Sequence, residues 1–396
     1  MKPPVATIEK RVKETDKNVQ EEMWDLIATL LKKALGRFLE NLLEDEITTK
    51  LKARRYERSP KRQGYRGGHY PRNLLTPYGL LENLRVPRLA EEAMDFQLLN
   101  KYERRRSDVD AAIGSLFIQG VSTRRLRSIA RELFGQEVSP TTVSKTAGYL
   151  DEELKHYQTK PLTDVFPFLF LDGITQKVRE IGVEKKVMLC ALGMRGDGTK
   201  EMLSFRLVDQ EDADSWRAFL VDLKSRGIQG KVLKLITTDG NPGLLKALKE
   251  IYPFLKVQRC IVHKLRNMAI KLKRVHLKPC MAEAKDIFNA SNRREAIKRF
   301  KAWKERWQVE EERAVRCLEK DLYHCLHYYS FPEVLWKKIR TTNVLERDFR
   351  EVRRRIRPMG FFPNEKSAQR IFYGVTNGIQ QNGQHPLASI SAQMLT

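Results

Sequence analysis

The chain has 396 residues, of which 41% are hydrophobic, which is enough for two to four domains with buried cores. Lys and Arg number 74 against 50 Asp and Glu, and the resulting net charge of +24 favours a polyanionic partner. No apolar run approaches the ~20 residues of a membrane-spanning helix, so no membrane partner is expected and nucleic acid is the expected polyanion.

The cysteines indicate a reducing compartment. Five of them occur, an odd number without a Cys-x-x-Cys pair, which is typical of free thiols. The polar stretch MKPPVATIEKRVKETDK carries no export signal. We therefore expect a cytoplasmic protein.

The N-terminal part combines helical and basic segments. Apolar residues recur at spacings of three and four over residues 20–52, which predicts one or two amphipathic helices that pack or self-associate. Residues 53–88 are rich in Arg, Tyr, Gly and Pro, which excludes a helix through most of the segment. Cations and rings alternate there, as in a loop or small β-unit that grips a sugar-phosphate backbone, at Tyr65, Arg66, His69, Tyr70 and Arg72. A solvated basic linker is the alternative.

Residues 108–156 show the pattern of a helix, a short turn and a capped helix. A helix-like run ends at Gly120, and Ser122 caps a second run. A third run begins behind Ser139 with Pro140 in its first turn. This pattern predicts a helix-turn-helix; small helical bundles that bind no DNA share it, and the net charge favours DNA. DNA contacts are then expected from Arg124, Arg125, Thr141, Thr142, Ser144 and Lys145.

Two apolar runs that end in carboxylates follow. The run VFPFLFLDG, residues 165–173, is short and ends on Asp172, which predicts a buried strand with a carboxylate at its tip. An Asp-Gly turn is the simpler explanation. However, VLKLITTDG, residues 232–240, repeats the pattern and ends on Asp239. Two strands that deliver carboxylates from their ends can form one site.

The order of elements around these strands predicts an α/β domain. Residues 165–260 show the order βββαβαβ, which is that of a ribonuclease-H-like sheet. In such a sheet the fourth strand lies parallel beside the first, which would bring Asp172 and Asp239 together. Residues 263–340 are basic and helical in pattern, and we expect them to form an all-α insertion in this domain.

One more helix is predicted from Thr342 to Pro358. It places Glu346 among six arginines. A salt bridge to Arg350 one turn later is the ordinary explanation. If Glu346 instead faces a scissile phosphate, the arginines of this helix are expected to contact the DNA backbone, namely Arg347, Arg350, Arg353, Arg354 and Arg357.

Four segments in a fixed order carry a resemblance to a known family. They are LDGxxxKVRE at 171–180, TDGNPGLLKAL at 238–248, QRCIVHKLRN at 258–267 and TTNVLERDFREVRRR at 341–355. The chain resembles the IS256-family transposases, bacterial relatives of the Mutator transposases, over nearly its whole length. The resemblance implies a DDE-type transposase with the acid triad Asp172, Asp239 and Glu346. It also implies that Cys260, His263 and Asn343 lie near the active site and that Lys177 and Arg179 contact DNA.

Two details of the resemblance stay open. Thr175 stands where the family often has an aromatic residue, which leaves the local DNA contact undefined. His276 and Cys280 follow the Cys260-x-x-His263 pair at a spacing that zinc could use. The resemblance covers only the first pair, so packing or hydrogen bonding beside the acids is the favoured role of Cys260 and His263.

The acid triad indicates metal-dependent chemistry. Carboxylates are hard oxygen ligands for Mg²⁺, with Mn²⁺ as a substitute. Two such ions about 3.5 to 4 Å apart can activate the attacking oxygen and stabilise the leaving one. We expect the protein to bind the terminal inverted repeats of its element, cut the ends and join them to target DNA. A nuclease that does not join ends and a DNA-binding regulator are the alternatives.

Holding two ends together predicts a homodimer or larger assembly at the bacterial nucleoid. The expected fold is α/β with a mainly α-helical N-terminal DNA-binding region. Its segments are an N-terminal helical and basic region (1–105), a helix-turn-helix-like domain (106–160), the first part of the ribonuclease-H-like catalytic core (161–262), the all-α insertion (263–340), the C-terminal helix of the core (341–380) and a tail (381–396).

Overall fold

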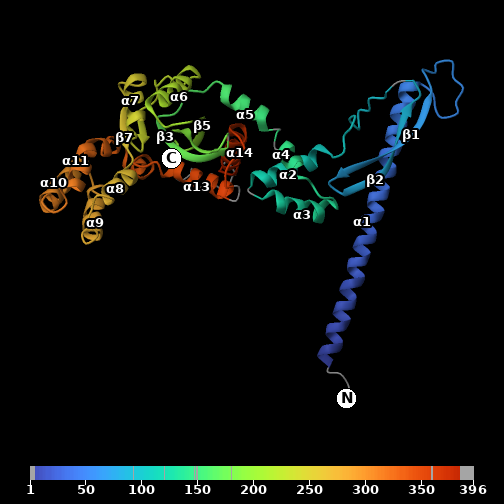
Figure 1. Cartoon of the computed structure of the whole chain (residues 1–396), viewed down its shortest axis with the longest axis horizontal. Coiled ribbons are helices and arrows are strands. Elements are labelled where there is room, and N and C mark those ends of the chain that lie inside the picture. The colour runs from blue at the N-terminus through green and yellow to red at the C-terminus, as the bar shows by residue number, and fades with distance from the viewer. Residues whose placement is uncertain are drawn as a thin grey trace. The chain divides into compact units, whose positions relative to one another are not determined.

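The computed structural model describes residues 5–91, 93–119, 121–146, 148, 150–179, 181–357 and 360–383, without the side chains of 5–18, 144 and 380–383. The chain divides into two compact units (Figure 1). The first comprises Met1–Phe117 and Val121–Ala147, and the second comprises Ile118–Gly120 and Gly148–Thr396. The helix ends predicted at Gly120 and Pro358 and most of the predicted tail lie outside the described residues.

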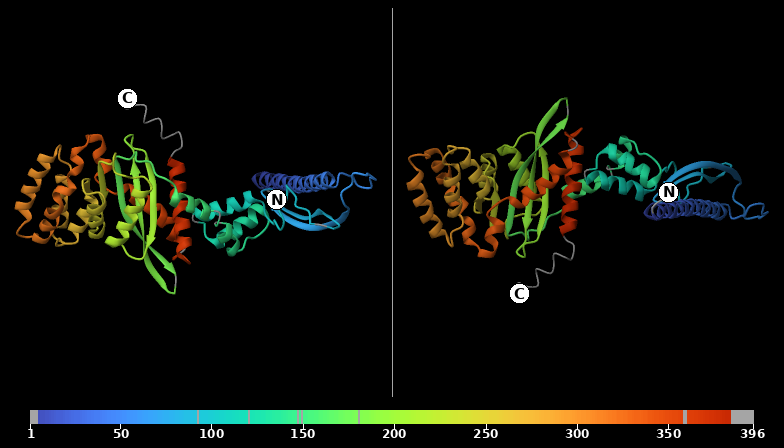
Figure 2. Two further views of the ribbon diagram at one scale, coloured as in Figure 1. Left: turned by 90° about the horizontal axis from the view of Figure 1, so that it is seen from above. Right: turned by 90° about the horizontal axis from the view of Figure 1, so that it is seen from below.

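The first unit begins with one long helix that packs on a β-hairpin. Helix α1 spans Val5–Leu51, and strands β1 (Arg66–Thr76) and β2 (Gly79–Leu89) pair antiparallel beside its last turns (Figure 2). The helix buries Leu43, Ile47 and Leu51 against the hairpin. The helix predicted over residues 20–52 is confirmed as a single one. The basic segment contains a β-unit and is not a linker, because β1 and β2 occupy most of it.

Three short helices complete the first unit. Helix α2 spans Ser107–Ile118, α3 spans Thr123–Phe134 and α4 spans Pro140–Thr146. The Ser122 hydroxyl accepts from the backbone N–H of Arg125, and Gly135 ends α3 with a left-handed φ of 72° that a residue with a side chain adopts only under strain. The helices share an apolar core. The predicted helix boundaries at Ser122 and Gly135 are therefore confirmed.

The second unit is built on a five-stranded mixed sheet with the order β5-β4-β3-β6-β7. Its strands are β3 (Phe168–Arg179), β4 (Val183–Met194), β5 (Lys200–Val208), β6 (Leu235–Thr238) and β7 (Lys256–Arg259). Strand β3 pairs antiparallel with β4 and parallel with β6. The expected parallel placement of the fourth strand beside the first is confirmed.

The prediction that the first strand of this sheet ends at Asp172 is wrong. Strand β3 continues to Arg179 because β4 pairs with it along its whole length, with Asp172 opposite Cys190. The shorter strand β6, which pairs parallel with β3, ends near Asp172, since the last β3–β6 pair is Leu171 with Thr238. Asp172 therefore lies inside a long strand, one residue beyond its last parallel pair.

Helices cover both faces of the sheet. Helices α6 (Ala213–Ser225) and α7 (Pro242–Ile251) lie on one face, over a core that includes Leu171, Trp216 and Phe219. Helices α5 (Leu150–Thr159), α13 (Asn343–Ile356) and α14 (Glu365–Gly383) contact β3 or β5. Phe372 of α14 lies 4.8 Å from the Phe205 ring of β5. Because strand residues alternate between faces, Asp172 is on the face opposite Leu171.

The residues after β7 form the predicted succession of helices. They are α8 (Ile261–Ala269), α9 (Leu277–Ile287), α10 (Arg293–Trp307), α11 (Glu312–Cys325) and α12 (Glu333–Ile339), with a 3₁₀ turn at His327–Ser330. A buried ionic cluster joins β7 to these helices, because Lys264 and Arg259 both pair with Asp321. Among the helices that the structure describes, none is long and apolar enough to cross a membrane.

Candidate active site

Asp172 is a buried carboxylate with one local hydrogen bond. Its side chain is 7% exposed, and its Oδ1 accepts from the backbone N–H of Gly173 at 2.9 Å. Burial, and then the negative charge of Asp239, raise the pKa of Asp172 to about 7. This mutual repulsion, which the charge of His263 opposes only in part, indicates that the two aspartates lie close together.

Asp239 is held in a tight turn between β6 and α7. Its Oδ1 accepts from the backbone N–H of Asn241 at 2.9 Å, and the Asn241 side chain caps α7. Gly240 has a φ of 87°, and a Cβ there would lie 2.0 Å from the Arg259 guanidinium. Arg259 in turn donates to the Asp239 carbonyl oxygen at 3.2 Å. The sequence Asp-Gly-Asn-Pro thus fixes the carboxylate where β6 ends.

Glu346 comes from the first turn of α13, far along the chain, and pairs with helix α8. The Nη1 of Arg266 lies 2.8 Å from Glu346 Oε1, and the Nε2 of His263 lies 3.3 Å from the same oxygen. The intrahelical bridge to Arg350 was the ordinary explanation of Glu346. Among the described residues, the ion pairs of Glu346 lead to α8 and not to Arg350.

His263 connects the three acids. Its Nδ1 lies 3.3 Å from Thr342 Oγ1. The hydrogen bond with Cys260 raises the pKa of His263 to about 9, and the charges of Asp172 and Asp239 act in the same direction. Burial opposes ionisation of the Cys260 thiol, but hydrogen bonds from His263 and Thr342 outweigh it and lower its pKa. The expectation that Cys260 and His263 bond beside the acids agrees with this geometry.

The described residues include no formed zinc site. His276 bonds to Glu311 at 2.8 Å, and Cys280 is buried, with Trp303 donating to its carbonyl oxygen. Over the described part of the chain, no three His, Cys, Asp or Glu side chains are arranged to hold a metal ion. The donor chemistry of the three acids nevertheless fits a hard divalent cation, because such ions prefer carboxylate oxygens and the charge of Asp239 raises the pKa of Asp172.

A fourth carboxylate, Glu211, was missed in the sequence. It precedes α6, and the Trp216 indole N–H donates to its Oε1 at 3.2 Å. Its Oε2 lies 3.2 Å from the position of a Cβ at Gly173. Burial, and then the charge of Asp239, raise the pKa of Glu211. Because Asp212 next to it is an ordinary helix cap, the only sequence signal was an extra acid before that cap.

The family model described as "Transposase, Mutator family" matches residues 7–385. The chain belongs to the Mutator family of transposases.

Named relatives agree with this assignment. The chain is 35% identical over 342 residues to the transposase for insertion sequence element ISRM5 of Rhizobium meliloti, covering 86% of this chain and 85% of the relative. It is 34% identical to the transposase for IS406 of Burkholderia multivorans, covering 85% and 87%. It is 31% identical to the IS256 transposase in transposon Tn4001 of Staphylococcus aureus, covering 87% and 88%. The resemblance to IS256-family transposases is confirmed.

In this Mutator-family chain, most of the residues predicted to contact DNA from the second unit are exposed. Lys177 and Arg179 lie on the far part of β3, beside the exposed Thr175, and the Arg179 guanidinium lies 4.3 Å from the Phe361 ring. Asn343 begins α13 and is exposed. The arginines of α13 that were predicted to contact phosphates are exposed, namely Arg347, Arg350, Arg353, Arg354 and Arg357. Arg354 is partly neutralised by Glu351 at 2.9 Å.

In the first unit, some predicted DNA contacts have structural roles. Arg66 donates to Thr48 Oγ1 at 2.7 Å and lies 3.6 Å from Glu44. His69 also bonds to Glu44, at 2.6 Å. These side chains fasten β1 to α1. Arg72 donates to the carbonyl oxygen of Asn100 at 2.9 Å, so its guanidinium is held by the backbone.

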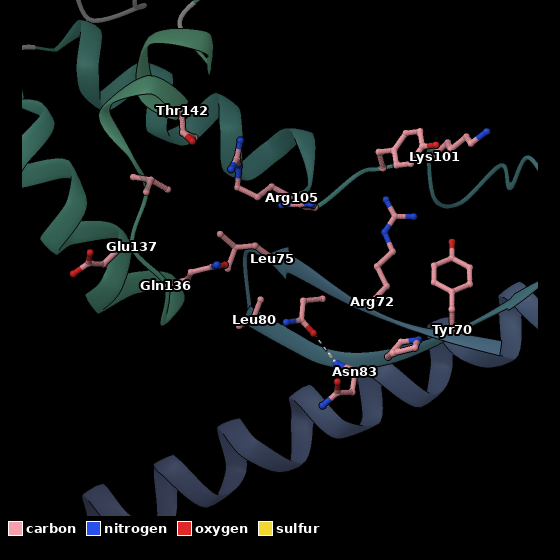
Figure 3. A pocket seen from close by; sticks show the side chains of 15 residues that line it. Tyr70, Arg72, Leu75, Leu80, Asn83, Lys101, Arg105, Gln136, Glu137 and Thr142 are labelled. Carbon is pink, nitrogen blue, oxygen red and sulfur yellow. Dashed lines mark hydrogen bonds between the residues drawn. The ribbon is translucent and has the colours of Figure 1, made fainter.

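A pocket of about 790 Å³ in the first unit is lined by residues of the hairpin and of the helical segment. Figure 3 shows Tyr70 and Arg72 on one side of it and Arg105 and Thr142 on the other. The other residues predicted to contact DNA from this unit are exposed on α3 and α4, namely Arg124, Arg125, Thr141 and Lys145, while the side chain of Ser144 lies outside the described residues. The pocket is therefore lined by members of both predicted DNA-binding segments.

If the acid pair holds Mg²⁺, as the sequence predicts, replacement of Glu211 by glutamine should lower DNA cleavage by about 10- to 100-fold at limiting Mg²⁺, because a charge beside the acid pair is lost while the shape is kept. Cleavage measured across a Mg²⁺ titration tests this, with part of the rate restored at high concentration. Glu184→Gln, which removes an exposed acid at the far end of β4, should behave as the unaltered protein. Equal rates for Glu211→Gln and the unaltered protein at every Mg²⁺ concentration would exclude this role.

Proposed function

We propose that this chain is a DDE-type DNA transposase. In this proposal it binds the terminal inverted repeats of its insertion sequence, cleaves DNA strands there and transfers them into target DNA. The observation that carries the proposal is the grouping of Asp172, Asp239 and Glu346 around His263, from three segments far apart in the sequence. The names of the relatives, all insertion sequence transposases, support it.

The proposal includes a ribonuclease-H-like core. Three antiparallel strands followed by two parallel ones support it. This order places β3 directly beside β6, so that the last paired residues of the two strands lie side by side. We also propose that α8 to α12 form an insertion into that core, since they lie between β7 and the helix that carries Glu346. The six segments predicted from the sequence remain part of this proposal.

The three acids would hold two Mg²⁺ ions, with Mn²⁺ as a substitute. When bound, these ions would neutralise charge on the phosphodiester and activate the attacking oxygen. The protein contributes position: the turn at Asn241 fixes Asp239, and the long pairing of β3 with β4 fixes Asp172. His263 and Arg266 hold the Glu346 carboxylate toward the sheet. A charged His263 also offers a proton donor beside the acids.

One experiment separates the proposed activity from its alternatives. Purified protein is incubated with labelled element-end DNA, a target plasmid and Mg²⁺. Products joined to the plasmid support the transposase. Cleaved ends without joining support a nuclease, and a mobility shift without cleavage supports a DNA-binding regulator; either result would overturn the proposal.

The exposed arginines of α13 give a further prediction. Replacing Arg353 by alanine should weaken binding of any DNA sequence and lower the slope of log K against log salt by about 0.9, because one phosphate contact is lost. Arg353 is exposed and is not the residue one turn after Glu346. Arg353→Lys keeps the charge and should keep the slope. An unchanged slope in Arg353→Ala would assign the residue to solvated surface.

A further inference from the structure

Within the described part of the chain, the middle of helix α1 has no partner. Residues 19–31 of this helix are exposed on every side, whereas its last turns pack on the hairpin. The exposed part is nevertheless rich in large apolar side chains, such as Trp24 (62% exposed) and Leu31 (64% exposed). Contiguous apolar surface of this kind marks a contact with another molecule.

Most of the exposed apolar residues form one stripe, with Leu26 on one flank and Trp24 and Leu31 on the other. Its members follow at steps of four, four, three, four and four residues: Val19, Met23, Ile27, Leu30, Ala34 and Phe38. At about 100° per residue they share one side of the helix. The residues that pack on the hairpin, Leu39 and Leu43, lie on the opposite side. The stripe therefore stays open along the packed part of α1 as well, and Phe38 there is 60% exposed.

The apolar positions of the stripe have the same spacing in both directions from its centre. Around the Ala28–Thr29 peptide bond, Ile27 mirrors Leu30. Farther out, Met23 mirrors Ala34 and Val19 mirrors Phe38. A second α1 laid antiparallel across this point would match every apolar residue of the stripe with an apolar residue. Such a two-fold contact uses the same surface on both copies.

The charges beside the stripe match in the same register. Glu22 lies along one flank of the stripe, and Lys33 and Arg37 lie along that same flank farther on. In the antiparallel pair, Glu22 of each copy falls between Lys33 and Arg37 of the other. On the other flank, Trp24 falls beside Leu31. A parallel pair in register would instead set Phe38 against Phe38 and leave Glu22 away from both cations.

We propose that α1 is a self-association element, which pairs two copies of this chain antiparallel about Ala28 and Thr29. The seam consists of the stripe from Val19 to Phe38, and the bridges between Glu22 and Lys33 or Arg37 set its direction. The partner is a second copy and not another protein, because the stripe and its charges complement themselves. The contact is independent of DNA and of the acid triad.

Sedimentation of the full-length protein without DNA tests the contact. We expect a dimer at micromolar concentration, and Leu30→Asp should raise the dissociation constant at least about 100-fold, because two buried leucines are lost from each dimer. Ala28→Asp is the matched control, since it adds the same charge to α1 outside the stripe, and it should keep the dimer. A monomer in the unaltered protein, or equal weakening by both variants, would overturn the proposal.

Cross-linking tests the direction. In the antiparallel pair, residue 27 of one copy meets residue 30 of the other. Oxidising a mixture of Ile27→Cys and Leu30→Cys proteins should therefore link them, whereas each variant alone should not form this link. Linking of each variant to itself would indicate a parallel pair and overturn the proposal. Because no DNA is present, failure here is distinguishable from failure to cleave or join ends.

Discussion

If the acids hold metal ions as proposed, replacing Asp239 by asparagine is expected to lower both cleavage and strand transfer by at least roughly 10³-fold, since stabilisation by a bound metal ion is worth several kcal/mol in the transition state. An asparagine side-chain oxygen can still accept the hydrogen bond from the backbone N–H of Asn241, so the turn is kept and only the charge is lost. Binding to element ends should remain, because these carboxylates are not the cationic side chains that contact phosphate. Cleavage and mobility-shift assays with the same labelled DNA measure the two effects.

The same result is expected for Asp172→Asn and Glu346→Gln. A suitable control is Asp197→Asn, which changes an exposed acid whose oxygen accepts from Thr199 in the turn between β4 and β5. This variant should cleave normally. If any one of the three acid variants still transfers strands at the normal rate, that residue does not belong to the triad.

The second large effect is expected at Asp321. Its carboxylate is 8% exposed and pairs with Lys264 and with Arg259 at 3.0 Å, and Lys264 is itself buried. Replacing Asp321 by alanine leaves two cations without their partner, and breaking a buried pair in this way costs about 3 to 5 kcal/mol. Urea unfolding at pH 7 should show that loss. Glu319 lies on the same helix as Asp321, and Glu319→Ala, which removes its exposed bridge to Lys304 of α10, should cost less than about 1 kcal/mol.

The effect of Asp321 should depend on pH with a definite sign. Burial alone would raise its pKa, but the hydrogen bond from Lys264 and the charge of Arg259 lower it. A carboxyl whose pKa is lower in the folded state stabilises the fold above its unfolded pKa, about 3.9. This stabilisation is lost as pH falls through the folded pKa. The gap between the unaltered protein and Asp321→Ala should therefore shrink only in acid below about pH 4, and a gap that is constant down to pH 2 would contradict this.

Local patterns predicted much of the fold. Ser122 and Gly135 bound α3 because capping chemistry involves only near neighbours. The parallel placement of β6 beside β3 was likewise predicted from the order of elements. The end of β3 was not, because it is set by pairing with β4, and the apolar run itself stops at Asp172. A strand can continue past its apolar residues when a neighbour supplies hydrogen bonds.

Long-range contacts explain what the sequence could not predict at the site. The intrahelical partner suggested for Glu346 was Arg350, but tertiary packing places His263 and Arg266 of another helix next to it. Glu211 carries no motif and is placed beside Asp239 only by the packing of α6 under the sheet. Arg66 and His69 resembled DNA contacts by composition, whereas Glu44 on α1 binds both. Sequence identifies which residues carry chemistry, and packing decides which of them meet.

The position of Glu346 on α13 also determines when a newly made chain acquires the third acid of the proposed triad. Asp172 and Asp239 belong to strands and turns that are complete once β7 has been synthesised, but Glu346 follows only after α8 to α12. At roughly 5 to 20 residues per second, the ribosome needs several more seconds to reach it. During that interval the first unit, with its exposed arginines, has already been made, whereas the carboxylate that pairs with His263 has not. A translation product that stops before α13 would therefore keep the basic N-terminal unit and lack the third acid.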